Sequence, residues 1–144
     1  MDTAARTPLH LWIVGALATV WNGFGSLDYT MTQLRHPAWM SQMTEEQRAF
    51  VESAPYWLDA TWAMGVWGGL FGAVLLLAKS RYAVVAFAIS LLGLAGNTLS
   101  QMTLPEPSPH LDSGGGLALH AAVWAIAIIL LVYALRMRRR DALR

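Results

Sequence analysis

The chain has 144 residues, of which 56% are hydrophobic and only 13% are charged, and its formal net charge is +1. A soluble domain usually carries about 25% charged residues, so half that fraction indicates that lipid surrounds much of the chain. The sequence contains no cysteine, which excludes a disulfide framework, a thiolate metal site and a thiol nucleophile. We therefore expect a single membrane domain over residues 1–144, with no additional soluble domain.

The first apolar segment covers about residues 9–32. Pro8 precedes it, which suits the first turn of a helix, where a missing N–H has no cost. The first half of the segment is plainly apolar, whereas the second half carries Asn22, Ser26 and Asp28. No small-residue cleavage site follows a short apolar core, so we expect a retained membrane span and not a removed signal peptide.

The connection between the first two apolar segments carries one helical signal. Thr44-Glu45-Glu46-Gln47 matches a capping box, which predicts a short helix over about 45–52. Trp39, Met40, Met43 and Phe50 could rest in the headgroup region of the membrane, an interpretation that is not favoured over the alternative. An ordinary loop helix with a few apolar contacts is the alternative.

Three further apolar segments, at about 56–78, 82–102 and 117–135, complete a predicted all-α, four-helix membrane bundle. Within the first of these three segments, the 22 residues of 57–78 would form a helix about 33 Å long at about 1.5 Å per residue. This length is close to the thickness of a hydrocarbon core, about 30 Å. A tight turn at 79–81 predicts a helical hairpin. The prolines and glycines of 105–116 predict an extended connection before the last segment.

Glycines in the second span occur in two pairs, each four residues apart: Gly65 with Gly69, and Gly68 with Gly72. Small residues at this spacing let two helix backbones approach closely in lipid, where packing replaces the hydrophobic effect. We therefore predict that the second span is the helix against which the others pack.

The distribution of basic residues predicts the orientation of the bundle. Arg6, the 79–81 turn and the arginines of 136–140 fall on one side of a four-span chain. The other side carries Arg35 and Arg48 together with five acidic residues, which are Glu45, Glu46, Glu52, Glu106 and Asp112. The prediction is that both termini lie in the cytoplasm and that the two longer loops lie outside.

With that orientation, every span places a polar or ionisable side chain toward its outer end. The first and third spans carry Asp28 and Asn97 late, while the second and fourth carry Asp59 and His120 early. Gln101 lies one helical turn after Asn97, and this pair predicts hydrogen bonds between helices. The intramembrane polar groups are thus expected in one layer, in the outer third of the membrane.

Asp28 is the most costly of these groups. It lies near the carboxy-terminal end of its helix, where the helix dipole disfavours an anion, and an ionised carboxylate inside a span costs about 3 kcal/mol. We expect compensation by a proton, by a partner such as His120 or Arg35, or by a ligand. Asp59 lies in a first turn, which favours negative charge, so a simple interfacial charge is an equal alternative. For His120, a hydrogen bond to a neighbouring helix is favoured over metal binding or proton transfer.

Tryptophans that lie deep in the predicted spans could form the apolar wall of a small-ligand site beside these polar groups. Packing inside the bundle is the alternative interpretation. The candidate ligand-binding residues are Trp21, Asn22, Asp28, Tyr29, Asp59, Trp62, Trp67, Asn97, Gln101 and His120. The pattern identifies no catalytic residue, no metal-ligand spacing and no cofactor.

Two blocks carry a resemblance to a known group of proteins. WNGFGSLDYTMT at 21–32 and WAMGVWGG at 62–69, followed by SLLG in the third span, resemble small four-span inner-membrane proteins of proteobacteria that are often labelled sugar transporters. The resemblance covers most of the chain and implies four helices in a bacterial inner membrane. Six of the candidate residues match the group's pattern, and they are Trp21, Asn22, Asp28, Tyr29, Trp62 and Trp67. The resemblance implies no particular substrate.

Three functions remain open from the sequence. The favoured one is binding or transport of a small molecule or lipid at an outward-facing polar pocket, with membrane lipid and a homo-oligomer as expected partners. The alternative is an accessory subunit of a larger membrane complex, which docks through its glycine and tryptophan faces. An enzyme that uses Asp28, Asp59 and His120 is the least favoured. The arginine-rich tail needs no nucleic acid to explain it.

Overall fold

A computed structural model describes residues 7–104, 108–109 and 114–144. Within these residues the protein is all-α, with no strand. Arg6, Glu106, Asp112 and most of the proline-rich connection, which the predictions above used, lie outside the described residues. The helices are α1 (Leu9–Gln33), α2 (Pro37–Met40), α3 (Glu45–Ser53), α4 (Tyr56–Leu77), α5 (Ala83–Thr103) and α6 (Gly114–Arg139).

The four long helices correspond to the four predicted apolar segments. Three agree within one or two residues at each end, whereas α6 begins earlier than expected and continues to Arg139. The capping box of α3 is confirmed, because Thr44 Oγ1 accepts from the Gln47 N–H and the Gln47 side chain accepts from the Thr44 N–H. The short helix α2 was not predicted. It starts at Pro37, whose fixed φ suits a first helical turn.

Three helices of the described chain, α4, α5 and α6, are long and apolar enough to cross a membrane. Helix α1 has 25 residues and is therefore also long enough, but the polar residues of its second half lower its hydropathy. The outward surface is strongly apolar. On α1, for example, Ile13, Leu17, Val20 and Phe24 are each at least half exposed.

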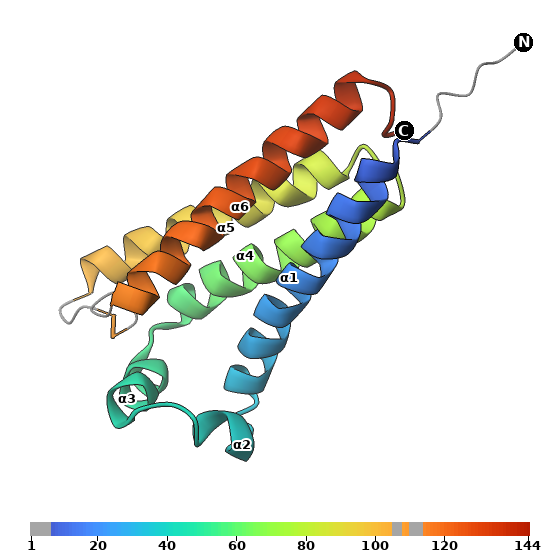
Figure 1. The fold of residues 1–144 in the computed structure, drawn as a ribbon. Helices are drawn as coiled ribbons and strands as arrows, with labels where there is room; N and C mark the ends of the chain where they lie inside the picture. The colour runs from blue at the N-terminus through green and yellow to red at the C-terminus, as the bar shows by residue number, and fades with distance from the viewer. Residues whose placement is uncertain (1–6, 105–107, 110–113) are drawn as a thin grey trace, which may run out of the picture.

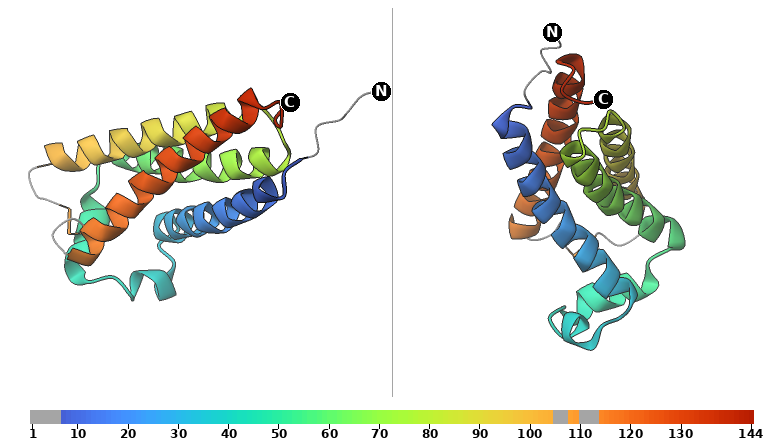
Figure 2. Two further views of the ribbon diagram at one scale, coloured as in Figure 1. Left: turned by 45° about the horizontal axis from the view of Figure 1, so that its top comes forward. Right: turned by 90° about the vertical axis from the view of Figure 1, so that its right-hand side faces the viewer.

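Helix α4 packs with two of the other three long helices, so the prediction that all of them pack against it is met for α1 and α5 but not for α6. Helix α4 packs along α5 on one side and along α1 on the other, and α6 packs on α5 (Figure 1). The four helices therefore follow one another as a curved layer in the order α1, α4, α5, α6. Figure 2 shows that α2 and α3 lie together beyond one end of this layer, whereas the start of α1 and the carboxyl end of the chain lie near its other end.

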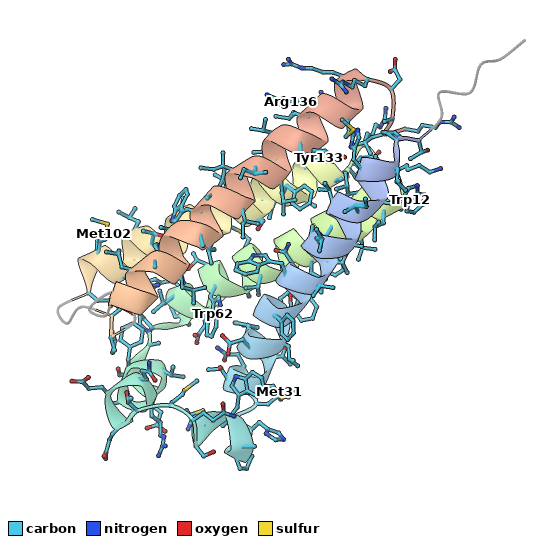
Figure 3. All side chains as sticks on the ribbon, in the orientation of Figure 1. Trp12, Met31, Trp62, Met102, Tyr133 and Arg136 are labelled. Carbon is cyan, nitrogen blue, oxygen red and sulfur yellow. The ribbon has the colours of Figure 1, made fainter. Side chains whose placement is uncertain are left out.

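The buried core lies mainly near the end where α1 begins and α6 ends. Leu11, Ala73, Leu76, Phe87 and Ala134 come from all four long helices and are 2% exposed or less. The carboxy-terminal segment closes this end, because its last residue exchanges two backbone hydrogen bonds with the turn between α4 and α5. We call this end of the protein the packed end. Figure 3 shows Trp12 and Tyr133 near the packed end, and Met31 and Trp62 toward the opposite end.

Close contact between α4 and α5 depends on glycine. A Cβ added at Gly68 would lie 3.0 Å from the Ser90 backbone nitrogen, and one added at Gly93 would lie 2.5 Å from the Gly65 nitrogen. The distance at Gly93 is too short for a real Cβ atom, so a larger residue there must push the two backbones apart, whereas one at Gly68 needs a shift of a few tenths of an ångström. Ser90 Oγ also donates to the Gly65 carbonyl at 2.6 Å, which adds an interhelical hydrogen bond to the same contact.

We expect Gly93→Ala to lower the free energy of unfolding by about 1–3 kcal/mol, because the new methyl group meets backbone atoms that cannot move individually. Unfolding of the purified protein in detergent measures this change. Gly23→Ala is the matched control: no atom lies within 4 Å of its added Cβ. The control should leave stability unchanged or raise it by up to about 1 kcal/mol. Equal effects at both positions would contradict the proposed tight contact.

Candidate ligand-binding cleft

Helices α1 and α6 meet at one end only. His10 Nδ1 and Tyr133 Oη lie 2.5 Å apart near the packed end, and the two helices separate toward the end that carries α2 and α3 (Figure 1). Between them lies a cavity of about 790 Å³, which we call the cleft. Residues from α1, α4, α5 and α6 all line it, and residues of α2 and α3 line its wide end.

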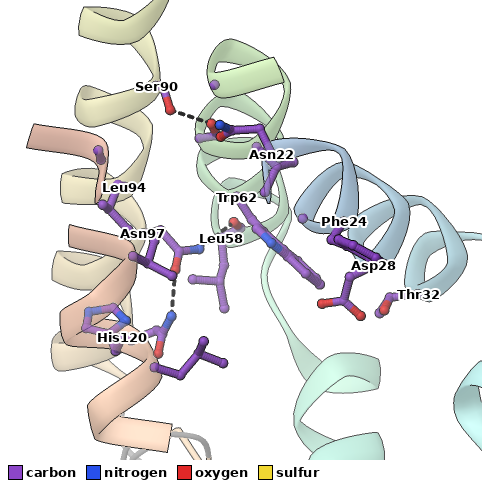
Figure 4. Close-up of a pocket in the computed structure, with 18 of the residues that line it drawn as sticks. Asn22, Phe24, Asp28, Thr32, Leu58, Trp62, Ser90, Leu94, Asn97 and His120 are labelled. Carbon is purple, nitrogen blue, oxygen red and sulfur yellow. Dashed lines mark hydrogen bonds between the residues drawn. The ribbon is translucent and has the colours of Figure 1, made fainter. Parts of the chain in front are cut away.

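Helix α1 contributes Asn22, Asp28 and Thr32 to the cleft, and the last two lie one turn apart on the same face (Figure 4). The Asn22 side chain occupies the space that the absent side chain of Gly69 leaves free, while its Nδ2 donates to the Ala18 carbonyl at 2.8 Å. Asn22 therefore joins α1 to α4 at the depth of the glycine contact.

Asp28 receives its hydrogen bond from an unexpected partner. Trp39 Nε1, in α2, donates to Asp28 Oδ1 at 2.7 Å. Neither His120 nor Arg35, the partners considered from the sequence, forms a hydrogen bond or ion pair with Asp28 in the described chain. The bond ties α2 to the last turns of α1, so Trp39 helps to form the wall of the cleft and is more than an interfacial anchor.

Helix α4 contributes Asp59 and Trp62, which lie three residues apart and therefore on one face. The Trp62 ring meets the ring of Tyr29 edge-on, with centroids 5.0 Å apart. Asp59 lies in the first turn of α4, where the helix dipole favours an anion. Within the described residues its carboxylate has neither a hydrogen bond nor an ion pair.

The polar side chains of α5 are largely engaged inside the protein. Asn97 Nδ2 donates to the Leu58 carbonyl at 3.2 Å, and Gln101 Nε2 donates to Asn97 Oδ1 at 2.6 Å. The first bond joins α5 to α4 and confirms the interhelical bonding predicted for Asn97, whereas the second lies within α5. Together with Ser90, these residues fix α5 against α4 and leave few free donors for a ligand.

His120 of α6 is held by two neighbours. Trp124 Nε1 and Thr98 Oγ1 each lie 3.2 Å from His120 Nε2. Trp124 Nε1 also lies 3.2 Å from Thr98 Oγ1, and the Thr98 hydroxyl donates to the Leu94 carbonyl at 2.9 Å, so the three side chains form one hydrogen-bonded cluster. The hydrogen bond to Thr98 also joins α6 to α5, as expected for a histidine that bonds to a neighbouring helix.

Of the ten candidate residues, eight line the cleft. Tyr29 is not among the lining residues but touches one of them, Trp62. Trp67 is directed elsewhere: it is 37% exposed, and its ring lies 6.1 Å from that of Phe71. The eight lining residues are Trp21, Asn22, Asp28, Asp59, Trp62, Asn97, Gln101 and His120.

Sequence reasoning missed several residues that line the cleft. Thr32 could have been found, because it lies one turn after Asp28 on the same helix face. Trp39 and Phe50 come from the connection between α1 and α4, whose path the sequence did not predict. Ser108 lies between two segments that the structure does not describe.

Two hydroxyl groups at the cleft are buried without a partner. Thr32 is 1% exposed and Ser108 is fully buried, and among the described residues neither side-chain oxygen forms a hydrogen bond. A buried hydroxyl without a partner costs about 1–3 kcal/mol. In the part of the chain that is described, no three His, Asp or Glu side chains lie close enough together to hold a metal ion.

We expect a coupling free energy of about 1 kcal/mol between Trp39 and Asp28, because the carboxylate accepts a charge-assisted hydrogen bond at a partly exposed position. A double-mutant cycle with Trp39→Phe and Asp28→Ala, read from unfolding in detergent, measures it. Trp12→Phe at the packed end serves as the control and should show no coupling to Asp28→Ala. A coupling near zero for both tryptophans would mean that the bond does not stabilise the fold.

Comparison with known proteins identifies no relative of this chain. No protein-family model, no curated protein and no solved structure matches the chain.

Proposed function

We propose that this protein is a four-span protein of a bacterial inner membrane that binds a small molecule or lipid in the cleft between α1 and α6. One observation carries the proposal: a cavity of about 790 Å³ is lined by all four long helices, with ionisable groups at its wide end. Ligand sites in proteins usually have volumes of about 300–1,000 Å³ and mostly apolar walls with a few polar groups. Transport would be a further step. Because four spans are few for a transporter, a second copy of the chain would be needed to perform it.

The position of α1 supports its assignment as the fourth span. Its Gly15 lies against Leu77 at the end of α4, and its Tyr29 lies against Trp62 near the start of α4. Helix α1 therefore runs antiparallel to α4 over most of the length of a helix that is itself long and apolar enough to span. Its polar residues face the cleft, while an exposed apolar stripe at helical spacing faces outward.

We expect a membrane-impermeant maleimide to label Ser41→Cys but not Thr7→Cys in intact cells, because four spans with cytoplasmic termini place these residues on opposite sides. The chain contains no cysteine, so each variant carries a single reactive thiol. After the cells are opened, both positions should react. Labelling of both in intact cells would show that α1 does not cross the membrane.

The glycine contact also favours binding over a role as an accessory subunit. Gly65 and Gly68 of α4 are covered by α5, Gly69 by Asn22 and Gly72 by Phe87. The glycine face is therefore used within one chain and is not open for docking another protein or a second copy. A homo-oligomer would have to form through a different face.

We expect Ala127→Phe to abolish any ligand-induced rise in melting temperature, because the new ring fills the cleft without removing a polar group. The measurement is thermal unfolding in detergent across a panel of sugars, lipids and small organic compounds. Ala125→Phe, on the exposed side of the same helix, is the matched control and should keep the response of the native protein. If no compound stabilises the native protein, or if the two variants respond alike, the proposed binding site is wrong.

A further inference from the structure

We propose that the ligand of the cleft is an organic cation with a substantial apolar part. This inference rests on the proposed function and narrows it to one chemical class. Its first support is the charge of the lining residues. Asp28 and Asp59 both line the cleft, whereas no lysine or arginine of the described chain does. The lining residue His120 is already engaged at Nε2, where it bonds to Thr98 and Trp124.

The second support is that the carboxylates are the polar groups left without adequate partners. The neutral donors Asn97, Gln101 and Ser90 already bond to acceptors of the protein. By contrast, Asp28 receives one hydrogen bond, and Asp59 receives none from the described residues. A carboxylate can accept about four hydrogen bonds. The free capacity of the cleft is therefore mainly for accepting hydrogen bonds and for balancing positive charge.

An independent observation places a ligand near these carboxylates. The Thr32 side chain is 1% exposed, has no hydrogen-bond partner among the described residues, and lines the cleft one turn after Asp28 (Figure 4). Buried hydroxyl groups in proteins are nearly always paired with protein, water or a ligand. An ammonium or similar group beside Asp28 would give this hydroxyl a partner as well.

Aromatic rings surround the same end of the cleft. Trp62 and Phe24 lie on either side of Asp28 in the close-up view (Figure 4), and Trp39 donates to it. The faces of such rings attract cations, and tryptophan does so most strongly. Farther along, the cleft is lined by aliphatic side chains such as Leu94 and Val123, which suit an apolar substituent. Anions would meet two carboxylates here, and sugars would find few free donors.

The test compares two ions of the same shape and opposite charge, tetraphenylphosphonium and tetraphenylborate. Equilibrium dialysis against the full-length protein in an uncharged maltoside detergent measures their binding. We expect the cation to bind and the anion not to bind. Replacing both carboxylates, with Asp28→Asn and Asp59→Asn, should weaken cation binding at least tenfold while keeping the size of each side chain.

Asp141→Asn is the matched control, because Asp141 lies beyond α6 at the opposite end of the protein, and it should leave cation binding unchanged. Equal binding of both ions, or cation binding that survives loss of both carboxylates, would overturn the inference and leave the cleft as a site for uncharged molecules. If neither ion binds while an uncharged compound does so and is excluded by Ala127→Phe, the charge class is wrong but the proposed function stands. If nothing binds, both fail.

Discussion

The structure depends on the close approach of α4 and α5. The two backbones come so close that a methyl group added at Gly93 would collide with α4, and one added at Gly68 would be crowded by α5. In lipid, where an apolar side chain gains nothing by leaving its surroundings, such contacts and the hydrogen bonds beside them provide the main attraction between helices. Once α4 and α5 are joined, α1 and α6 must attach to opposite sides of the pair.

The cleft follows from this order of packing. Because α1 rests on α4 and α6 rests on α5, the two outer helices have no extended surface in common. They touch through His10 and Tyr133 near the packed end and diverge from there. The wide end is not filled by large side chains from a neighbouring helix. Short residues such as Ser90 and Asn97 instead bond to α4 and leave the space open.

The electrostatics of the wide end set the chemistry of the site. A carboxylate held within a membrane helix costs about 3 kcal/mol unless something balances it. The protein supplies one indole N–H to Asp28 and the first turn of α4 to Asp59, and in the described residues it brings no basic side chain to either. These two carboxylates, with so few partners among the described residues, are the groups that the proposed cation would balance.

Much of this arrangement could be predicted from the sequence. Long apolar runs define the four long helices, and the glycine spacing of α4 identified the helix on which α1 and α5 pack, although α6 packs on α5 instead. The outer polar layer was predicted from the depth of each residue along its helix, so Asp28, Asp59, Asn97 and His120 were expected at one level. The position of a residue along its helix does not tell which direction its side chain faces around the helix axis, however. For this reason Trp67 was expected beside the cleft, although its side chain points away from it.

The parts that could not be predicted depend on contacts between distant segments. Nothing in the sequence indicates that the connection after α1 folds back so that Trp39 reaches Asp28, because this requires the unpredicted helix α2. Hydrogen bonds from Asn97 and Gln101 were expected. That these bonds use up donors of the cleft and leave it with more free acceptors than free donors becomes visible only when each hydrogen bond is assigned. Charge balance at the site is thus a property of the fold and not of the sequence pattern.

The separation of α1 from α6 has a consequence for how the site is reached. If α1 spans the membrane as proposed, the gap between these two helices faces acyl chains along much of its length, while α2 and α3 cover the end that faces water. A molecule would then enter sideways, after it has dissolved in the bilayer. Occupancy would follow its partition coefficient and local enrichment in the leaflet more closely than its concentration in solution. Apparent affinity would therefore change with the amount of lipid present, even when the protein is unaltered.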